Sequence, residues 1–267
     1  MSKIILEKID KLNYHSKESY KALRTNLQFC GSDVKTILFT SCTQNEGKSS
    51  VTFNVAVSMA NAGKKIVFID ADLRKSVLIG RHKVSTSVLG LSHFLSGQCE
   101  LKEIIHETNI DGMDMILCSK YPPNPAELLG QESFRIMIEA LKKVYDYVII
   151  DSPPLGMVID SAIISTCCDG AVIVVEAGKT NYKFVQDIKK QLDKSKCKIL
   201  GVVLNKVPTI RKGAYGKYGK YGKYGRYYGQ YYGRYEDEKN DEIATAKEDD
   251  IMNNEIATER ITSLNNN

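Results

Sequence analysis

Short apolar runs alternate with helix-like segments between residues 35 and 207. Six runs rich in aliphatic and β-branched residues are expected to be strands: Thr36–Thr40, Lys65–Ile69, Met113–Cys118, Tyr147–Ile150, Gly170–Val175 and Ile199–Leu204. Several are apolar at almost every position, which is typical of strands buried on both faces of a parallel sheet. Segments with helical length and composition are Ser49–Ala62, Glu132–Val144 and Tyr182–Lys194. The alternation predicts a doubly wound α/β domain, with helices on both faces of a mainly parallel sheet.

The pattern changes on either side of this domain. The preceding residues contain one amphipathic stretch, Ser16–Phe29, whose apolar positions recur at helical spacing. After Pro208 come a repeat of Gly, Tyr and Lys or Arg and then an acidic stretch, and neither has enough aliphatic side chains to form a core. We expect four segments: an N-terminal helical segment (1–34), the α/β domain (35–207), a tyrosine-rich tail (208–235) and an acidic, disordered extension (236–267).

Charge is distributed unevenly along the 267 residues. The formal net charge is +5, but Arg211–Tyr235 holds seven Lys/Arg and no acid, and the residues after it hold ten Asp/Glu against three Lys/Arg. A basic stretch followed by an acidic one is typical of an exposed tail. Aromatic side chains between Arg and Gly could also stack on single-stranded nucleic acid, so composition alone leaves the tail's partner open.

Neither a membrane span nor a disulfide framework is expected. No apolar run approaches the roughly 18 residues that cross a bilayer, and Lys3 and Glu7 interrupt the N-terminus too early for a secretory signal. The seven cysteines are scattered and form no Cys-x-x-Cys pair, which favours reduced thiols over disulfides or a zinc site. These features predict a cytoplasmic protein.

The first expected strand leads into a loop, Ser41–Ser50, and then into a helix. The loop ends in Gly47-Lys48-Ser49, as in a phosphate-binding P-loop, where backbone amides and a helix N-terminus hold the phosphates. Lys48 would reach the β- and γ-phosphates, and the Ser49 hydroxyl would ligate Mg²⁺. Cys42 replaces the usual first glycine and raises the hypothesis of redox sensitivity; an ordinary helix start with a serine cap is the alternative. The candidate nucleotide-binding residues are Thr43, Asn45, Glu46, Gly47, Lys48, Ser49 and Ser50.

Two more expected strands end in carboxylates. Lys65–Ile69 is followed by Asp70 and Asp72, and Tyr147–Ile150 is followed by Asp151. Because the carboxyl ends of parallel strands share one edge of the sheet, these side chains should lie beside the P-loop. Each could separately be a solvated loop residue or a turn cap, but a carboxylate at a buried strand end needs a metal or another partner. The combination predicts a site for a nucleotide with Mg²⁺.

Together these motifs resemble the bacterial tyrosine kinases (BY-kinases) of capsular and exopolysaccharide biosynthesis, in the Gram-positive form whose kinase is a separate cytoplasmic chain. The resemblance runs from about Glu18 to Tyr235. It rests on a Walker A loop (41–50), an Asp-x-Asp-x-Arg motif (70–74), an Asn-Pro-Ala-Glu-Leu-Leu segment (124–129), a Walker B Asp-x-Pro-Pro motif (151–154) and the terminal tyrosines. It implies a P-loop NTPase-like fold, with ATP and Mg²⁺ as cofactors. The family has Pro-Gly where this chain has Gln44-Asn45, and Asn tolerates a left-handed backbone better than most residues.

The resemblance also implies roles for individual residues. The implied metal ligands are Ser49, Asp70 and Asp151, and the implied catalytic residues are Lys48, Asp70 and Asp72. Lys48 would bind the β- and γ-phosphates. Asp70 and Asp72 would orient or deprotonate the tyrosine hydroxyl, which is a poor nucleophile because the pKa of a phenol is near 10. Which of the two is the base stays open.

Five further residues gain expected roles from the resemblance. Arg74 would be a phosphate or structural contact, and Asn205 an adenine contact. Glu18, Lys21 and Arg24 match the family's Glu-x-x-Arg-x-x-Arg oligomerisation motif, with Lys in place of the first Arg. Their spacing places them on one helix face, suited either to pairing across subunits or to simple solvation. The resemblance implies a ring-like homo-oligomer.

The nine tyrosines of the tail are the implied autophosphorylation sites: Tyr215, Tyr218, Tyr221, Tyr224, Tyr227, Tyr228, Tyr231, Tyr232 and Tyr235. Each phosphate would add about −1.5 to −2 charges, so full modification would turn the segment from +7 to roughly −7 to −11. Attraction to the three carboxylates would become repulsion. We expect modification in trans within the ring, followed by dissociation. Nucleic acid is not an expected partner once the kinase motifs are considered.

The resemblance implies partners as well. A membrane-anchored polysaccharide chain-length regulator would activate the kinase at the inner face of the plasma membrane, and polysaccharide-synthesis enzymes would be further substrates. Two other functions stay open: a P-loop ATPase switch of the partition or septum-positioning type, and a regulatory binding module whose tail recruits nucleic acid or protein. The ATPase switches typically carry an additional lysine early in the P-loop, which residues 42–46 lack.

Overall fold

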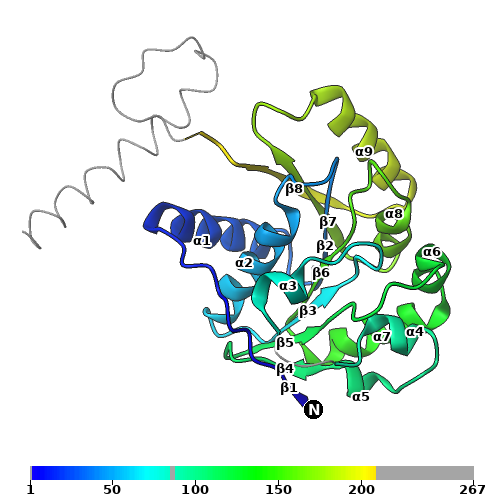
Figure 1. Cartoon of the computed structure of the whole chain (residues 1–267). Coiled ribbons are helices and arrows are strands. Elements are labelled where there is room, and N and C mark those ends of the chain that lie inside the picture. The colour runs from blue at the N-terminus through cyan, green and yellow to red at the C-terminus, as the bar shows by residue number, and fades with distance from the viewer. Residues whose placement is uncertain (1, 85–87, 209–267) are drawn as a thin grey trace, which may run out of the picture. The chain divides into compact units, whose positions relative to one another are not determined.

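A single mixed sheet organises the computed structural model, which describes residues 2–84 and 88–208 (Figure 1). In these residues the strand order is β1-β4-β5-β3-β6-β2-β7-β8, and all neighbouring strands are parallel except β4 and β5. The strands are β1 (Ser2–Lys3), β2 (Thr36–Ser41), β3 (Ile66–Asp70), β4 (His106–Glu107), β5 (Met113–Ile116), β6 (Tyr147–Asp151), β7 (Gly170–Glu176) and β8 (Ile199–Asn205).

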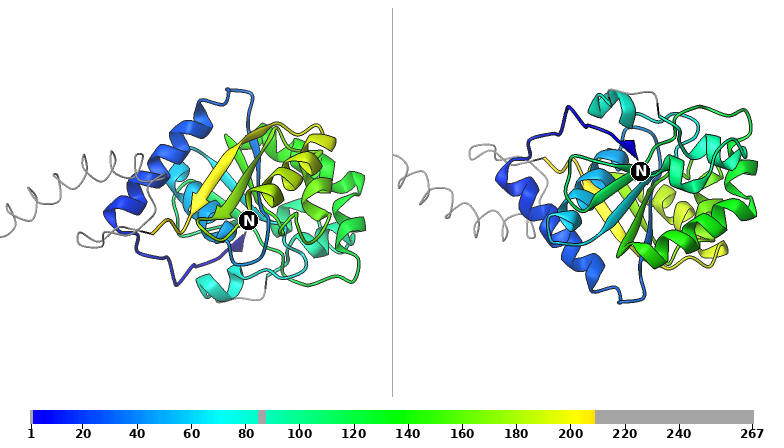
Figure 2. Two further views of the ribbon diagram at one scale, coloured as in Figure 1. Left: turned by 90° about the horizontal axis from the view of Figure 1, so that it is seen from above. Right: turned by 90° about the horizontal axis from the view of Figure 1, so that it is seen from below.

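Helices cover both faces of the sheet, as the two views along the layers show (Figure 2). One face packs against α1 (Tyr14–Gln28), α2 (Lys48–Ala60) and α3 (Leu78–His82). The other face packs against α4 (Leu91–Leu95), α5 (Leu101–Ile104), α6 (Pro125–Leu129), α7 (Glu132–Val144), α8 (Asp160–Ser165) and α9 (Tyr182–Lys194). The central strands β2 and β3 are buried along their whole length, because neither face is open to solvent.

Helix α2 follows the P-loop and lies between the sheet and α1. It is buried almost all round, through Val51, Phe53, Val55, Ala56 and Met59 among others, which explains its weak apolar periodicity. In contrast α7 and α9 are amphipathic and bury one stripe each. Helix α2 therefore has a rigid setting on both sides, and this setting fixes the position of Lys48 at its first turn.

The expected fold class is confirmed: a mainly parallel sheet with helices on both faces. Each expected strand has a counterpart within one or two residues of its predicted bounds, and so does each expected helix. Seven further elements were not expected from the sequence: β1, β4, α3, α4, α5, α6 and α8. These elements have two to six residues, which is too short for a hydrophobic period to show.

The N-terminal residues pack on the α/β domain. The Ile4 backbone N–H donates to the Glu107 carbonyl at 2.9 Å, and Ile4 and Leu6 are buried. Helix α1 follows and lies against α2, so that residues 2–84 and 88–208 belong to one compact unit. Within this part of the chain, no helix is both long and apolar enough to cross a membrane. The tyrosine-rich tail and the acidic extension lie outside the described residues.

Candidate active site

Three neighbouring strands bring the expected site residues to one edge of the sheet. In the order β3-β6-β2, Asp70 ends β3 and Asp151 ends β6, and the two stand opposite each other in register. Strand β2 leads through the P-loop to Lys48 at the start of α2. The structure thus brings together Lys48, Asp70 and Asp151, at the carboxyl edge where α/β sheets bind their ligands.

Lys48 and Asp151 form a buried ion pair. The Lys48 Nζ lies 2.5 Å from Asp151 Oδ1, and the two side chains are 7% and 2% exposed. The same Nζ donates to the Ser49 hydroxyl at 3.2 Å, while the Thr52 hydroxyl donates to Asp151 Oδ1 at 3.3 Å. Lys48 therefore contacts two of the side chains expected to ligate Mg²⁺, Ser49 and Asp151, and Asp151 balances its charge.

Asp70 is fully buried and only half satisfied. Its Oδ2 accepts a hydrogen bond from the Ser76 hydroxyl, and its Oδ1 has no partner among the described residues. Burial and then the charge of Asp151 raise the pKa of Asp70 to about 7. A buried carboxylate that has one oxygen without a hydrogen-bond partner, and that lies beside a second carboxylate, favours the binding of a cation at this point.

The donor set fits Mg²⁺ held together with phosphates. Within residues 2–84 and 88–208 no group of three or more His, Cys, Asp and Glu side chains could enclose a metal by itself. Mg²⁺ prefers oxygen ligands and is usually bound by one or two carboxylates, with waters and substrate phosphates filling the other positions. Asp70, Asp151 and the Ser49 hydroxyl offer this kind of set.

The P-loop turns through two left-handed residues, Asn45 (φ 65°) and Gly47 (φ 86°). The left-handed conformation that Asn was expected to tolerate is present. Asn205, at the end of β8, donates from Nδ2 to the Glu46 carbonyl at 2.9 Å, and a Cβ on Gly47 would approach that nitrogen to 2.1 Å. Asn205 therefore lies against the P-loop, and Gly47 is required there both by its backbone and by this close contact.

Other P-loop side chains are already bound within the protein. The Thr43 N–H donates to the buried Glu46 carboxylate, and the Ser50 hydroxyl accepts from Arg81 Nη1 at 2.6 Å. Arg81 was not expected at the site. It lies seven residues after the Asp-x-Asp-x-Arg motif, and only the position of α3 brings it to the start of α2. Cys42 is fully buried.

Asp72 and Arg74 point to different partners. Asp72 is half-buried, and its Oδ1 accepts from the backbone N–H of Arg74 at 3.3 Å and of Lys75 at 2.9 Å. The Arg74 guanidinium forms two parallel bonds of 2.8 and 2.9 Å to Asp160, which is fully buried at the start of α8. Of the two expected roles, Arg74 has the structural contact. Asp160 belongs to no sequence motif and was therefore not among the expected site residues.

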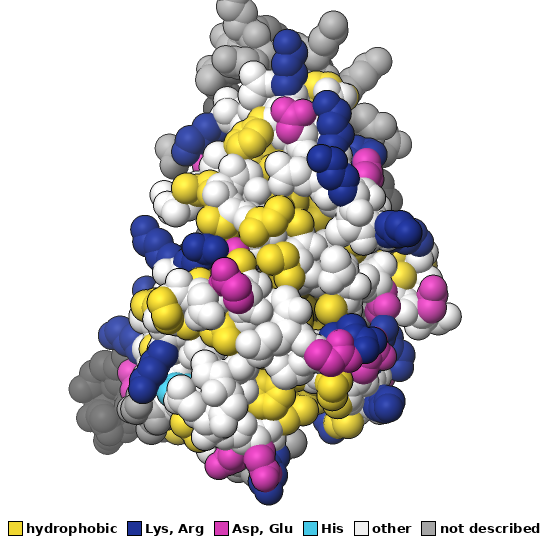
Figure 3. Space-filling model, turned by 90° about the vertical axis from the view of Figure 1, so that its right-hand side faces the viewer, with side chains coloured by type: hydrophobic (Ala, Val, Ile, Leu, Met, Phe, Trp, Pro, Cys, Tyr) yellow, Lys and Arg dark blue, Asp and Glu magenta, His cyan; other side chains and the backbone are white. Residues whose placement is uncertain are grey.

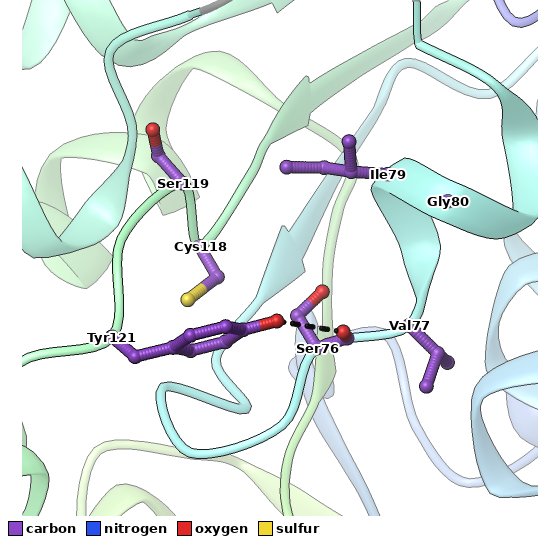
Figure 4. A pocket seen from close by; sticks show the side chains of 7 residues that line it. All are labelled: Ser76, Val77, Ile79, Gly80, Cys118, Ser119 and Tyr121. Carbon is purple, nitrogen blue, oxygen red and sulfur yellow. Dashed lines mark hydrogen bonds between the residues drawn. The ribbon is translucent and has the colours of Figure 1, made fainter.

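A pocket of about 390 Å³ opens between the segment that follows β3 and the segment that follows β5 (Figure 4). It is lined by Ser76, Val77, Ile79, Gly80, Cys118, Ser119 and Tyr121. The Tyr121 hydroxyl donates to the Ser76 carbonyl at 3.0 Å, while the Ser76 hydroxyl binds Asp70. The pocket wall is thus connected to the carboxylate by one serine. None of these residues was singled out from the sequence, because β5 is brought beside β3 only by the sheet.

The three residues of the expected oligomerisation motif differ in their surroundings. Lys21 is exposed and pairs with Glu18 within α1 at 2.6 Å. Arg24 instead donates to the Ser58 carbonyl of α2 at 2.9 Å. Arg24 therefore connects α1 to the rest of the domain, whereas the side chains of Glu18 and Lys21 are partly or largely exposed to solvent. The nine expected phosphorylation sites lie outside the described residues.

On the face shown in Figure 3, Lys and Arg side chains are interspersed with Asp and Glu and with small apolar patches. Surfaces that bind nucleic acid usually gather Lys and Arg into a band. This face has no such band.

Comparisons with known proteins agree with this geometry. A family model described as "AAA domain" matches residues 34–200. The tyrosine-protein kinase CpsD of Streptococcus agalactiae is 44% identical over 192 residues, covering 72% of this chain and 84% of the relative. The tyrosine-protein kinase YwqD of Bacillus subtilis is 34% identical, covering 75% and 85%. The solved kinase domain of the Escherichia coli tyrosine kinase ETK superposes with a TM-score of 0.67 at 31% identity, covering 75% and 80%. The chain belongs to the bacterial tyrosine-kinase family of P-loop proteins.

Proposed function

We propose that this kinase transfers the γ-phosphoryl group of ATP, with Mg²⁺, to tyrosine hydroxyls, including those of its own cluster Tyr215–Tyr235. The observation that carries the proposal is the convergence of Lys48, Asp70 and Asp151 at the end of three adjacent strands. Kinship with CpsD and YwqD, both named tyrosine-protein kinases, supports phosphoryl transfer over the ATPase-switch and binding-module alternatives.

The residues divide the work by position. Lys48 would exchange Asp151 for the β- and γ-phosphate oxygens, and the amides at the start of α2 would hold the same phosphates. Ser49, Asp70 and Asp151 would hold Mg²⁺, which neutralises charge on the phosphates when bound. Asp72 lies two residues beyond the buried Asp70 and is partly open to solvent. We assign it as the acceptor of the phenol proton as the tyrosine oxygen bonds to phosphorus and the bond to ADP breaks.

Phosphorylation in trans is compatible with the length of the tail. The described domain ends at Pro208, and the 27 residues from there to Tyr235 span at most about 95 Å when extended. The tail carries +7 before modification, and the site presents three carboxylates. We propose that this attraction favours the ring-like oligomer and that phosphorylation reverses it. Native mass measurements before and after ATP treatment would test this, and an unchanged oligomer would contradict it.

The biological setting is inferred from kinship. We propose that the kinase regulates capsular or exopolysaccharide synthesis, that a membrane-anchored chain-length regulator activates it, and that polysaccharide-synthesis enzymes are further substrates. Support comes from the resemblance of the Asp-x-Asp-x-Arg motif and the tyrosine tail to the family that acts there. Co-purification of the kinase with such a regulator would test the pairing.

Labelling with γ-labelled ATP and Mg²⁺ distinguishes the functions. Label on Tyr215–Tyr235 in the wild type and not in Lys48→Met supports the kinase. Released phosphate without protein label indicates an ATPase switch. The absence of both label and released phosphate indicates a binding module. Circular dichroism of Lys48→Met must show a folded protein, because removal of Lys48 also leaves Asp151 unpaired.

A further inference from the structure

The carboxylate of Glu46 lies inside the P-loop. The residue is 1% exposed. Its Oε2 accepts from the Thr43 backbone N–H at 2.7 Å, and its Oε1 accepts from the Thr180 hydroxyl. Both partners are uncharged. Thr180 belongs to the loop that joins β7 to α9, and β7 is the neighbour of β2. One side chain thus connects the start of the P-loop to the adjacent strand–helix loop.

A negative charge is an unfavourable choice for this position. Burial of a carboxylate costs free energy, and a negative charge close to a triphosphate site repels the ligand. A neutral side chain would avoid both penalties. Glu46 must therefore supply something that outweighs them, and its two hydrogen bonds are what the structure offers.

The backbone around Glu46 is held from the other side as well. Lys206 Nζ donates to the Asn45 carbonyl at 2.5 Å, and Asn205 Nδ2 donates to the Glu46 carbonyl. The turn contains a left-handed residue other than glycine, Asn45, and such a conformation persists only when its surroundings hold it. The Glu46 carboxylate supports this turn from inside, and Asn205 at the end of β8 and Lys206 just after it support the turn from outside.

We propose that Glu46 is a positioning residue of the nucleotide site and that Thr180 orients it. By bridging Thr43 and Thr180, the carboxylate keeps the P-loop in the turn that precedes α2, so that the first amides of the helix are presented to phosphate. The proposal rests on the proposed function, because it assumes that this loop holds the phosphates of ATP.

Affinity for Mg²⁺–ADP, measured by calorimetry on the full chain, tests the proposal. Glu46→Ala should weaken binding roughly 10- to 100-fold, since the Thr43 amide loses its partner and the turn its support. Glu46→Gln should retain affinity within about 3-fold, because an amide can accept from Thr43 and donate to Thr180. Thr180→Val should weaken binding roughly 3- to 10-fold, and Thr180→Ser should restore it. The exposed Glu139→Ala on α7 is the control for loss of a carboxylate.

Kinetics separate positioning from general damage. In the tail-labelling assay, Thr180→Val should raise the KM for ATP and leave kcat within about 2-fold, because its hydroxyl does not touch the reacting groups. Tighter binding by Glu46→Ala would overturn the proposal and make the carboxylate a competitor of phosphate. Equal losses in Glu46→Gln and Glu46→Ala would also overturn it. If the wild type binds Mg²⁺–ADP but never labels tyrosine, the proposed function fails while the binding series still decides the role of Glu46.

Discussion

The ammonium group of Lys48 lies 2.5 Å from Oδ1 of Asp151, and both side chains are almost completely buried. Asp151 in turn stands opposite Asp70 on the neighbouring strand. Lys48 is therefore the cation that faces two neighbouring carboxylates, and it contacts one of them, Asp151, directly. Any ligand that draws Lys48 away must bring a cation to replace it, which is the physical reason to expect nucleotide and Mg²⁺ to bind together.

Lys48→Met should destabilise the ligand-free protein as well as abolish nucleotide binding. The substitution leaves Asp151 buried without a cation, and loss of one partner of a buried ion pair typically costs roughly 3–5 kcal/mol. Urea unfolding measures the change. The double variant Lys48→Met/Asp151→Asn should regain most of the stability. An unfolding midpoint for Lys48→Met equal to that of the wild type would show that the pair contributes nothing.

Asp70 should make the ligand-free protein less stable as pH rises from about 4 to about 7. Its pKa is raised from 3.8 to about 7, by burial first and then by Asp151. In this pH range the unfolded chain releases the proton while the folded protein keeps it, so unfolding becomes more favourable, by a few kcal/mol in total. Unfolding in EDTA at several pH values measures the slope. Asp70→Asn should flatten it, whereas the exposed Asp111→Asn should not; equal slopes in all three proteins would contradict the assignment.

Arg74→Ala should destabilise the segment between β3 and α3. The Arg74 side chain is 39% exposed, but its partner Asp160 is fully buried. The substitution would leave Asp160 without its two charged hydrogen bonds. A loss of about 1–3 kcal/mol is expected. Arg74→Lys should recover only part, because Lys cannot form the two parallel bonds. If Arg74→Ala/Asp160→Asn unfolds at the same urea concentration as Arg74→Ala, the pair is not coupled.

Arg24→Ala and Lys21→Ala should differ in the monomer. Arg24 bonds to the Ser58 carbonyl across the α1–α2 contact, so its loss should cost about 1 kcal/mol. Lys21 makes an exposed pair within α1, and its loss should cost less than about 0.5 kcal/mol. Unfolding at a concentration where the protein is monomeric provides the comparison. If the motif mediates assembly, Lys21→Ala should shift the oligomer in native mass spectra without changing this stability.

Peroxide should leave nucleotide binding unchanged, against the redox hypothesis raised by Cys42. The thiol is fully buried, and burial, then the Glu46 charge, raise its pKa to about 12. Oxidation requires an accessible thiolate, which Cys42 cannot offer near neutral pH. Mass spectrometry of the P-loop peptide after brief peroxide treatment should show Cys42 unmodified. Rapid oxidation at this residue would mean that the loop opens.

The α/β architecture and the composition of the site could be read from local patterns. Apolar runs such as residues 148–150 indicate buried parallel strands, because an exposed strand would not be apolar at every position. Gly47-Lys48-Ser49 and the carboxylates that follow two strands point to one edge, since parallel strands place their carboxyl ends together. These inferences depend only on the hydrophobic pattern within short segments and on the order of those segments along the chain, both of which the sequence gives directly.

Contacts between distant segments were decided by packing. Three side-chain pairs depend on which strands are neighbours and on how deeply each side chain is buried. They are Lys48 with Asp151, Arg74 with Asp160, and Glu46 with Thr180. The short elements β1, β4, α3–α6 and α8 likewise owe their conformation to the core they cover, because two to six residues have no stable structure alone. The three side-chain pairs lie 86 to 134 residues apart in the chain, where no local pattern can connect them.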